Sequence, residues 1–559
     1  MDTFDYVIVG AGAAGCVLAY RLGEQGYSVC VVEAGPSDSS PYIRVPAGFM
    51  KTYNDESITW PLVHQGSPGT NGRAIPFIQG KVLGGSSSVN GMVYSRGQAS
   101  DFDNWCRSGN KGWSYQDVLP YFRKDESFKS GGDDQYRGRD GGIPITTTSW
   151  RDDACESFIR GAVESGIPRN DDYNGSAQAG VGYCQSAIYR GKRWSASHGY
   201  LQPARKKYDV TILTGAVATR IVVEGKHAKG VEYLRTGSDE PKSVKSRLFT
   251  VISAGAVNSP KLLQLSGIGP GKLLQERGIP VVLDLPGVGE NLRDHYAARL
   301  VARARPGVKT INDRASGLPL VKEVLAWLLG RPSILAVSPI LVYGFWKSDA
   351  ALSETEFALS FTPASYKLGM TRRLDDFPGF TCGAWRLRPE SRGYVRIESN
   401  DHRVNPIIQP NFLDHENDRR ILVAGLKWAR KITKTDAMKN VLQAEILPGA
   451  ACETDDEWID FARQYGMSSY HLVGTCKMGP STDPFAVVDS ELRVHGIDGL
   501  AVIDASVMPT SPSGNTIAAT MMIAEKGADG LLADRKWPSG VGPDLHHGPL
   551  FAAPGTTPS

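Results

Sequence analysis

The sequence predicts a mixed fold, with an α/β part of Rossmann type and an α+β part built on antiparallel strands. The first part is indicated by residues 4–35, where an apolar run at 6–9, helical spacing of apolar residues over 14–22 and a second apolar run at 29–32 form a βαβ unit. The second part is indicated by residues 388–397, where turn residues lead into alternating polar and apolar positions, as in a half-solvated antiparallel strand.

The turn between the first strand and the helix carries the glycine pattern of a dinucleotide site. Gly10 permits a tight turn, Gly12 lets the backbone approach a pyrophosphate, and Gly15 allows the helix to pack closely on the strand. The helix N-terminus adds N–H groups and a dipole that favour an anion. Glu33 ends the second strand, 18 residues after Gly15, close to the spacing at which a carboxylate accepts hydrogen bonds from an adenosine ribose. Glycines at a turn are often only turn chemistry, but the order of all these features favours a nucleotide site.

Length and composition narrow the classes of protein. A chain of 559 residues is too long for one core, so roughly two to four domains are expected. The 62 basic and 59 acidic side chains give a net charge of only +3, which offers no argument for a nucleic-acid partner. The eight cysteines include no CxxC pair and no metal-ligand spacing, so we expect reduced thiols and no bound metal.

We expect a cytoplasmic protein without a spanning helix. The first strand begins within about five residues of Met1, which leaves no room for the apolar region of a signal peptide. No window of about 18 apolar residues occurs, and the nearest approach, residues 321–346, contains Lys322, Glu323 and Arg331. This segment is interpreted as a partly buried helix followed by a loop. The alternative is an apolar patch that faces another subunit or the inner face of a membrane, to which the protein would then be peripheral.

Residues 36–94 follow the βαβ unit. Residues 36–76 are rich in Gly, Pro, Asn and Thr and are expected to form an extended cover, with Trp60 as its largest aromatic side chain. Residues 80–94 contain two glycines followed by three serines, which bring backbone N–H groups and hydroxyls together and suit a polar group close to the main chain. Taken alone, this second segment could equally be a flexible turn. Residues 130–142, rich in glycine and charge, are expected to form a loop.

Two long segments carry a resemblance to a known family. Residues 80–103 resemble the first signature of the glucose–methanol–choline (GMC) family of FAD-dependent oxidoreductases, and residues 255–269 resemble its second signature. Both patterns stand in the right order after an N-terminal nucleotide fingerprint. The resemblance implies an FAD-binding domain of glutathione-reductase type, assembled from separated segments, beside a substrate domain whose large antiparallel sheet covers the reactive face of the flavin.

The expected domain organisation follows from this resemblance. Strands expected at 210–223 and 248–253 return the chain to the FAD-binding domain. The expected segments are a first part of the FAD-binding domain with the cover loop (1–155), a substrate-domain segment (156–205), a second part of the FAD-binding domain (206–300), the substrate-binding domain (301–465), a last part of the FAD-binding domain with the catalytic residues (466–536), and a disordered tail (537–559) that contains His546 and His547.

The resemblance also implies which residues bind the FAD. Val217 would offer its backbone to the adenine, and residues 501–509 would contact the pyrophosphate and the ribityl chain. Choline-oxidase-like members attach FAD covalently through a histidine at the position of Val89, so we expect non-covalent FAD here. The expected cofactor-binding residues are Gly10, Gly12, Ala13, Ala14, Gly15, Glu33, Ala34, Trp60, Val82, Gly84, Gly85, Ser86, Asn90, Gly91, Met92, Val93, Val217, Ala254, Gly255, Asp504, Ala505, Asn515 and Thr516.

A second glycine-rich segment resembles a nucleotide fingerprint without completing it. Residues 279–285 are expected to form a strand that runs into Gly287 and Gly289, but Leu292 stands where the third glycine should be. We interpret this segment as a turn. With one convincing nucleotide site, a bound flavin and a diffusible nicotinamide would be hard to house together, so the electron acceptor is expected to meet the flavin without NAD(P).

The catalytic residues implied by the resemblance are His471 and Asn515. Residues 468–475 resemble the catalytic-histidine segment of the family, and residues 512–520 resemble the segment of its partner. A neutral histidine, with an ordinary pKa of about 6.5, can accept the hydroxyl proton of an alcohol while a hydride passes from carbon to flavin N5. The Asn515 amide can hydrogen-bond the hydroxyl and orient the carbon–hydrogen bond. His295 is expected to be a structural residue near the domain junction.

The expected function is FAD-dependent oxidation of a primary alcohol, whether aliphatic, aryl or polyol, to the aldehyde. Within the family, the motifs resemble those of bacterial primary-alcohol, sorbose and choline-type dehydrogenases. Electrons are expected to pass to a quinone-like or artificial acceptor, with O2 as the alternative. Two other classes stay open at this stage, namely a hydroxynitrile lyase with non-redox FAD and a binding or structural flavoprotein. The oligomeric state stays open as well. The particular alcohol also stays open, because choline would need an aromatic or anionic cage and no motif shows where one lies.

Overall fold

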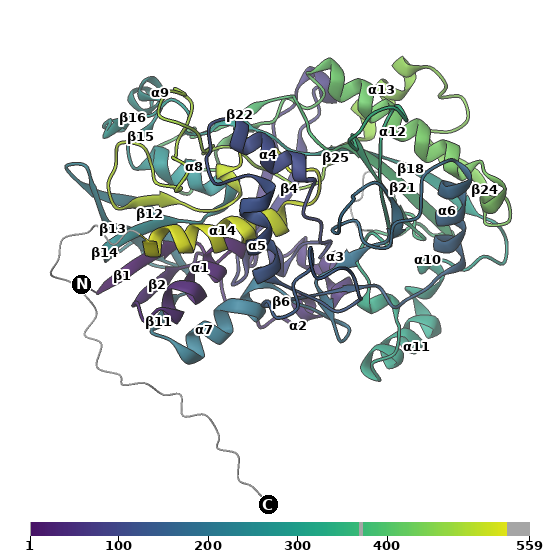
Figure 1. The fold of residues 1–559 in the computed structure, drawn as a ribbon, viewed down its shortest axis with the longest axis horizontal. Coiled ribbons are helices and arrows are strands. Elements are labelled where there is room, and N and C mark those ends of the chain that lie inside the picture. The colour runs from purple at the N-terminus through teal and green to yellow at the C-terminus, as the bar shows by residue number, and fades with distance from the viewer. Residues whose placement is uncertain (1, 368–372, 534–559) are drawn as a thin grey trace, which may run out of the picture.

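The computed structural model describes residues 2–367 and 373–533. The segment expected to be a disordered tail, with its two histidines, lies outside the described residues. In Figure 1, the mainly parallel sheet and its helices lie in the left half of the molecule. The large antiparallel sheet and its helices lie in the right half. A cavity lies between the two sheets, and residues of both sheets line it.

The predicted N-terminal βαβ unit is confirmed. It consists of β1 (Thr3–Val9), α1 (Ala13–Glu24) and β2 (Val29–Val32). The apolar residues of both strands are buried, as in a parallel sheet that helices cover on both faces. The two strands pair in parallel through residues 6–9 and 29–32, so the helix is a crossover between neighbouring strands.

The sheet that contains this unit has seven strands. Its parallel strands lie in the order β11, β2, β1, β14 and β26, and the antiparallel pair β12 and β13 extends from the first half of β14. The strands expected at 210–223 and 248–253 are present, although the first is divided in two by a turn. The bounds are β11 (Val210–Leu213), β12 (Ala216–Glu224), β13 (His227–Arg235), β14 (Lys242–Ile252) and β26 (Leu500–Val502).

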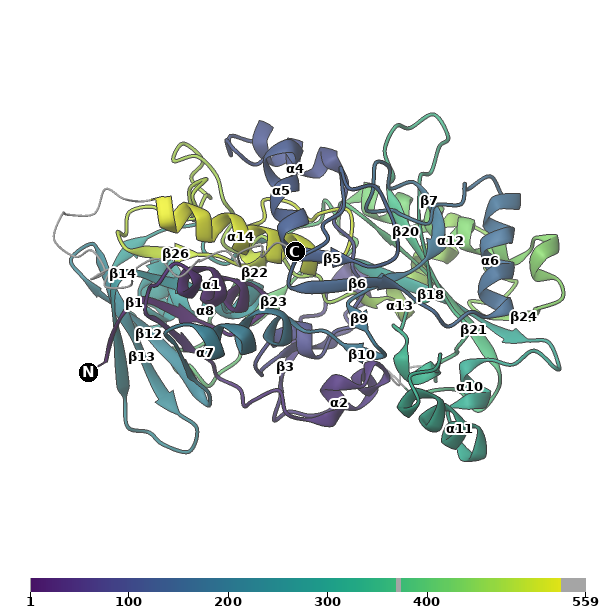
Figure 2. The same ribbon diagram turned by 60° about the horizontal axis from the view of Figure 1, so that its bottom comes forward.

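Three helices of this half begin at the cavity. α8 (Gly255–Leu265) follows β14 and packs against β12, while α14 (Thr516–Ala533) lies beside α1 (Figure 2). The first residues of all three helices, Ala13, Gly255 and Thr516, line the cavity. Since a helix N-terminus carries partial positive charge, this end of the cavity suits an anionic group.

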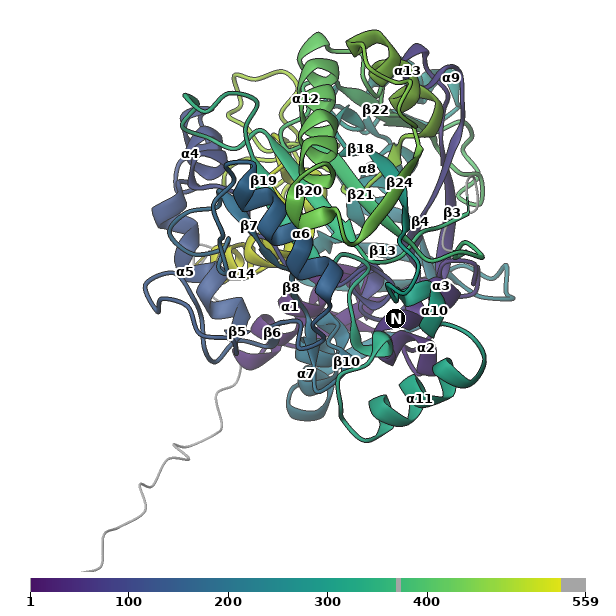
Figure 3. The same cartoon turned by 90° about the vertical axis from the view of Figure 1, so that its right-hand side faces the viewer.

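The large antiparallel sheet expected from the resemblance is present. Along β18, Ala298 and Leu300 pack into the core beneath α12 (Glu416–Thr433), whereas Arg299 and Val301 line the cavity. Figure 3 shows α12 and α6 on the outer face of the sheet. The bounds are β7 (Gly180–Tyr183), β18 (Tyr296–Ala304), β19 (Val342–Trp346), β20 (Phe357–Thr362), β21 (Gly379–Arg386), β24 (Leu442–Leu447), β25 (Met467–Ser468), α6 (Asp153–Glu164) and α13 (Asp455–Tyr465).

A third sheet corrects the prediction for residues 36–76. Instead of an extended cover alone, this stretch contributes the hairpin β3 (Thr59–His64) and β4 (Ile75–Gly80), and both strands bury apolar side chains. Pro61 in β3 and Pro76 in β4 obscure the strand pattern in the sequence. The other strands are β17 (Glu290–Leu292), β22 (Gly393–Arg396), which confirms the half-solvated strand predicted there, and β23 (Ile407–Gln409).

Two local predictions have mixed outcomes. The strand expected at 279–285 is reduced to β16 (Leu283–Asp284), because Ile279 packs against the end of α9 (Gly271–Glu276) rather than into a sheet. The turn expected after it is confirmed, and a Cβ on Gly289, whose φ is +91°, would lie 2.1 Å from the Val395 carbonyl oxygen. The loop expected at residues 130–142 is confirmed over its whole length. All eight cysteines are free.

The apolar segment at 321–346 begins inside α11 (Gly317–Leu328), which lies at the edge of the molecule (Figure 3). Within this helix Glu323 is buried, while Leu318, Leu328 and the following Leu329 are 79%, 66% and 69% exposed. The helix is therefore partly buried, as expected. It also has an exposed apolar patch, which was the alternative interpretation of this segment. None of the helices in residues 2–367 and 373–533 is long and apolar enough to cross a membrane.

Candidate functional site

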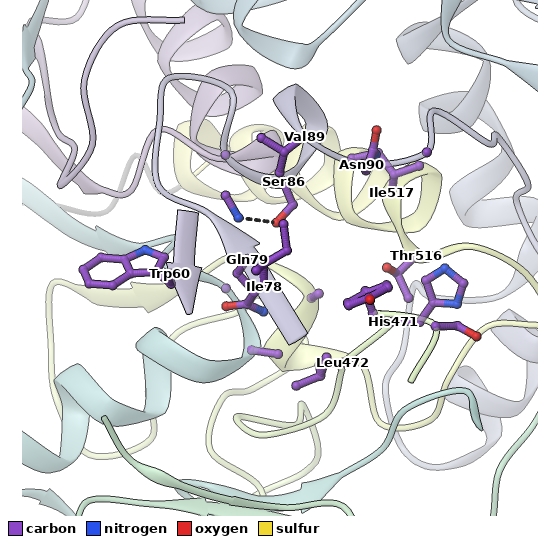
Figure 4. A pocket seen from close by; sticks show the side chains of 18 of the residues that line it. Trp60, Ile78, Gln79, Ser86, Val89, Asn90, His471, Leu472, Thr516 and Ile517 are labelled. Carbon is purple, nitrogen blue, oxygen red and sulfur yellow. Dashed lines mark hydrogen bonds between the residues drawn. The ribbon is translucent and has the colours of Figure 1, made fainter. Parts of the chain in front are cut away.

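The cavity has a volume of about 690 Å³ and is bounded by the edge of the parallel sheet, the hairpin β3–β4 and the inner face of the antiparallel sheet. Figure 4 shows Trp60 and His471 on opposite sides of it, with Ile78 and Gln79 of β4 between them. It lies beyond the carboxyl ends of β1 and β14, where open α/β sheets bind their ligands.

Most of the residues predicted to bind cofactor line this one cavity. Three do not: Gly15, Val82 and Gly84 lie behind its wall. A Cβ on Gly15 would lie 2.0 Å from the Gly10 carbonyl oxygen, which is the close helix-to-strand packing expected of this glycine. The residues that line the cavity as predicted are Gly10, Gly12, Ala13, Ala14, Glu33, Ala34, Trp60, Gly85, Ser86, Asn90, Gly91, Met92, Val93, Val217, Ala254, Gly255, Asp504, Ala505, Asn515 and Thr516.

Two glycine loops face each other with bare backbone at the nucleotide end of the cavity. A Cβ on Gly85 would lie 2.7 Å from the Cα of Gly12, and a Cβ on Gly10 would lie 2.5 Å from the Ser253 carbonyl oxygen. A Cβ on Gly12 meets nothing closer than 3.8 Å, so this glycine opens onto free space. Such a cradle fits a pyrophosphate that approaches the main chain.

Of the three serines after these glycines, only Ser86 lines the cavity. The hydroxyl of Ser87 donates to the Gly84 carbonyl at 2.6 Å, and that of Ser88 donates to the Leu83 carbonyl at 2.7 Å. The hydroxyls of these two serines therefore hold the loop in its own conformation, and neither serine was among the residues expected to bind the cofactor. The Ser86 hydroxyl accepts from the Gly80 N–H at 3.1 Å, as the dashed line in Figure 4 marks.

Two carboxylates fix the backbone around the nucleotide end. Glu33 accepts hydrogen bonds from the N–H groups of Ala11 and Gly35, both at 2.8 Å, and burial raises its pKa to about 6. Asp504 accepts from the Gly255 N–H at 2.8 Å and from the Ser259 hydroxyl at 2.5 Å, so it ties the start of α8 to β26. Each carboxylate oxygen has a further lone pair, which leaves Glu33 able to accept a ribose hydroxyl.

His471 and Asn515 meet at the other end of the cavity, although 44 residues separate them. The Asn515 Nδ2 lies 2.9 Å from the His471 Nε2. The hydroxyl of Tyr343, on β19, donates to the Asn515 Oδ1 at 3.1 Å. The backbone N–H of His471 donates to the Asp294 carboxylate at 2.8 Å, which fixes the backbone at this residue, and the preceding Tyr470 adopts a φ of +64°. The loop before β18 thus positions the imidazole.

His295 has a larger role than the structural one expected from the sequence. Its Nδ1 lies 2.9 Å from the His471 Nδ1, and its Nε2 lies 2.7 Å from the Leu387 carbonyl oxygen. Burial lowers the pKa of His295, and burial together with His295 lowers the pKa of His471 to about 3. Both rings are therefore neutral at physiological pH.

The contacts of the two neutral rings decide which nitrogen carries each proton. A carbonyl oxygen can only accept, so the His295 Nε2 must carry its proton and its Nδ1 must accept. The His471 Nδ1 is then the donor to His295, which leaves the His471 Nε2 without a proton. This nitrogen faces Asn515 and the cavity, ready to accept a proton. No spacing in the sequence pointed to this role of His295, because the contact arises only when β18 pairs with β25.

The inner face of the antiparallel sheet supplies cavity residues that the sequence did not identify. They include Arg299 and Val301 of β18, Ser360 of β20 and Trp385 of β21, and they line the part of the cavity remote from the glycine loops. In the sequence, these residues alternate with residues that enter the core. This alternation assigns them to one face of the sheet but does not show which face lines a cavity.

The comparisons with known proteins agree with this geometry. A family model described as GMC oxidoreductase matches residues 4–297 in its N-terminal part and residues 389–524 in its C-terminal part. An oxygen-dependent choline dehydrogenase of Brucella ovis is 38% identical over 531 residues, which cover 94% of this chain and 95% of that protein.

Two solved structures are similar over nearly the whole chain. A pyridoxine 4-oxidase from Mesorbium loti has a TM-score of 0.84 at 30% identity, covering 94% of this chain and 98% of its own. A formate oxidase of Aspergillus oryzae has a TM-score of 0.87 at 26% identity, covering 96% and 99%.

Proposed function

The chain belongs to the GMC oxidoreductase family, whose members use FAD to oxidise alcohols, and from that premise we propose that it oxidises a primary alcohol to its aldehyde with His471 as the general base. The observation that carries the proposal is the unprotonated Nε2 of His471, which faces the cavity beside the Asn515 amide. The removal of one proton and one hydride turns R–CH2–OH into R–CHO, and the hydroxyl proton goes to this nitrogen. A positioned base of this kind contributes about 10² to 10⁴ in rate.

FAD supplies the acceptor for the hydride when it is bound, and the residues of the cavity suit it. The bare-backbone cradle at Gly10, Gly12 and Gly85 would hold the pyrophosphate, and Glu33 would hold the adenosine ribose. Asn515 would orient the alcohol hydroxyl toward His471, because Tyr343 fixes its amide from the other side. Val89 lines the cavity with a side chain that forms no bond to a flavin, which supports non-covalent FAD. A denatured sample whose yellow colour stayed with the polypeptide would refute this.

The redox class is favoured over the two alternatives left by the sequence. The named relatives and structural neighbours are dehydrogenases and oxidases, and the base and its amide partner both stand in the cavity. A lyase with non-redox FAD or a purely binding flavoprotein would leave the flavin oxidised in the presence of any alcohol.

Choline, the substrate in the name of the Brucella protein, is poorly matched to this cavity. Among the described residues that line it, the carboxylates are Glu33 and Asp504, and both belong to the nucleotide end. A quaternary ammonium prefers an aromatic or anionic cage. Aromatic side chains such as Trp385 and Tyr470 do line the cavity, but the cationic Arg299 lies on the same wall and would repel a second cation. We therefore propose an alcohol without a cationic group.

The exposed patch of α11 supports a quinone-like electron acceptor in a membrane. Leu318, Val321, Leu325 and Leu328 recur at helical spacing and are all exposed, and the exposed charges of residues 317–331, Lys322 and Arg331, are both positive. Anionic lipid attracts such cations, while the leucines can enter the headgroup region. The helix is connected through residues 329–338 to Pro339 and Ile340, which line the cavity. Reaction with O2 is the alternative, which the name of the Brucella protein supports.

An anaerobic visible spectrum tests the proposed function. The purified flavoprotein is titrated with benzyl alcohol, a linear primary alcohol, a sugar alcohol and choline. Bleaching of the flavin band by a primary alcohol supports the proposal, and admitting air afterwards separates a dehydrogenase from an oxidase by how fast the colour returns. A flavin that stays oxidised with every alcohol, while a cyanohydrin is cleaved, would assign the lyase class instead.

A further inference from the structure

Arg299 lies on the cavity face of β18, in the part of the cavity away from the glycine loops. It alternates with Ala298 and Leu300, which enter the core, and the arginine keeps part of its surface open to the cavity. Cross-strand pairing places it opposite Gly383 of β21, and Gly383 is paired in turn with Ser360 of β20. The arginine therefore belongs to a row of residues across the middle of the sheet.

The glycine in this row lets the arginine lie flat along the sheet. A Cβ on Gly383 would lie 3.1 Å from the Arg299 Cγ and 2.9 Å from the Ser360 hydroxyl oxygen. The stem of Arg299 therefore occupies the space above Gly383, and a larger residue there would displace it. The first part of the arginine side chain therefore lies against the cavity face of the sheet.

Arg299 has no hydrogen-bond or salt-bridge partner in the part of the chain that the structure describes. Other arginines held in the interior are paired: Arg96 and Arg137 with Glu126, Arg386 with Asp418, and Arg430 with Glu445. Burial lowers the pKa of Arg299, and the groups that oppose this effect are the side chains of Tyr470 and Tyr366, not a carboxylate. A buried cation without a partner is costly, so the usual arrangement supplies a counter-charge.

The other cations of the cavity wall have acceptors in the protein itself. Arg73 donates to the carbonyls of Arg463 and Gly466, Lys261 donates to the His402 carbonyl, and Lys367 pairs with Asp376. Arg299 differs from them, because it lines the cavity with five N–H donors and no acceptor among the described residues. A guanidinium in this position matches a carboxylate, which it can bind through two parallel hydrogen bonds.

We propose that Arg299 binds the carboxylate of the substrate, so that the enzyme acts on primary alcohols that carry a carboxylate at some distance from the hydroxymethyl group. This inference rests on the proposed function, because the hydroxyl must lie at His471 and Asn515. His295, which contacts His471, immediately precedes β18 and lies four residues before Arg299, or roughly 13 Å along an extended chain. The reach of the arginine side chain shortens this span, which suits an aromatic ring with the two groups at opposite ends.

The test compares 4-(hydroxymethyl)benzoate with its methyl ester and with benzyl alcohol, by kcat/KM and by anaerobic flavin reduction. The wild-type holoenzyme should prefer the carboxylate by at least about 30-fold, because an unpaired buried charge is costly on either partner. The Arg299→Met variant should lose this preference while its rates with the two neutral alcohols change by less than about threefold, and Arg299→Lys should restore part of it. The Arg303→Met variant is the matched control, since Arg303 lies on the same strand outside the cavity wall and stacks on Phe377.

A binding measurement keeps this inference separate from the proposed function. 4-Methylbenzoate has no hydroxyl to oxidise, so its binding to the holoenzyme is followed through the change that it causes in the flavin spectrum. Binding by wild type and by Arg303→Met, weakened at least about 30-fold in Arg299→Met, supports the inference even if no alcohol bleaches the flavin. If Arg299→Met fails to retain flavin, Arg299→Gln serves as the second variant. Equal rates with carboxylate and ester in wild type, a preference for choline, or undiminished binding of 4-methylbenzoate by the variants would overturn the inference.

Discussion

The His295 Nδ1 lies 2.9 Å from the His471 Nδ1, and this contact determines which nitrogen of His471 is free to accept a proton. Because the other nitrogen of His295 is held by the Leu387 carbonyl, His295 can only accept from His471. The proton of His471 is thereby fixed at Nδ1, on the side away from Asn515. A contact between two imidazoles thus leaves the nitrogen on the opposite side of the His471 ring unprotonated.

Replacement of His471 by Ala should slow flavin reduction by about 10² to 10⁴, because the hydroxyl proton loses its acceptor. Flavin should remain bound, since the cradle at Gly10, Gly12 and Gly85 is untouched. Stopped-flow absorbance under anaerobic conditions measures the rate constant, and the ratio of visible to ultraviolet absorbance measures the flavin content. Reduction at the wild-type rate in this variant would show that His471 is not the base.

The pH dependence of kcat/KM should be flat on the acid side of neutrality. Burial and His295 lower the pKa of His471 to about 3, so the base stays unprotonated as the pH falls from 8 to 5. The His295→Leu variant removes one of the two causes, and its acid limb should move upward toward the ordinary histidine pKa of about 6.5. A wild-type limb near pH 6.5 would contradict this account.

The lowered pKa of His471 also predicts how the free energy of unfolding depends on pH. In the unfolded chain His471 binds a proton below about pH 6.5, whereas in the folded protein it does so only below about pH 3. The unfolded state therefore binds more protons in this window, and the free energy of unfolding should fall as the pH is lowered through it. The His471→Gln variant should show a shallower fall between pH 6.5 and pH 4 in urea unfolding at fixed flavin concentration. Equal slopes for the variant and the wild type would mean that other groups set the acid sensitivity.

A pair of glycine variants should separate cofactor binding from folding. A side chain on Gly12 points into open space, where the nearest atom to a Cβ is 3.8 Å away, so Gly12→Val should fold but lose FAD. A Cβ on Gly15 would lie 2.0 Å from a backbone oxygen, so Gly15→Val should destabilise the fold itself. Flavin content and thermal unfolding of the flavin-free protein distinguish the two. Retained flavin in Gly12→Val would refute the prediction for cofactor binding. An unchanged melting temperature in Gly15→Val would refute the prediction for folding.

The sequence predicted the βαβ unit, and the family resemblance identified the segments of His471 and Asn515, because both depend on local order. Alternation, helical spacing and the glycine turn of residues 4–35 are local, and so are the motif segments around His471 and Asn515. The hairpin β3–β4 was missed because each of its strands contains a proline, Pro61 in one and Pro76 in the other. The contacts of His295 and the orientation of Arg299 were missed for another reason. Both depend on which strands pair and which face of β18 meets the cavity, and neither choice leaves a mark on neighbouring residues.

The exposed leucines of α11 should bind anionic membranes. Leu318, Leu325 and Leu328 are exposed, and Lys322 and Arg331 add positive charge beside them. The double variant Leu325→Glu/Leu328→Glu should lose co-sedimentation with vesicles of phosphatidylglycerol and phosphatidylethanolamine, yet keep its flavin and its rate with a soluble artificial acceptor. The rate with a quinone embedded in the vesicles should fall with the binding. Val163→Glu is the matched control, because Val163 is an exposed apolar residue on α6, away from α11. Wild-type protein that stays in the supernatant would contradict the membrane role and favour O2 as the acceptor.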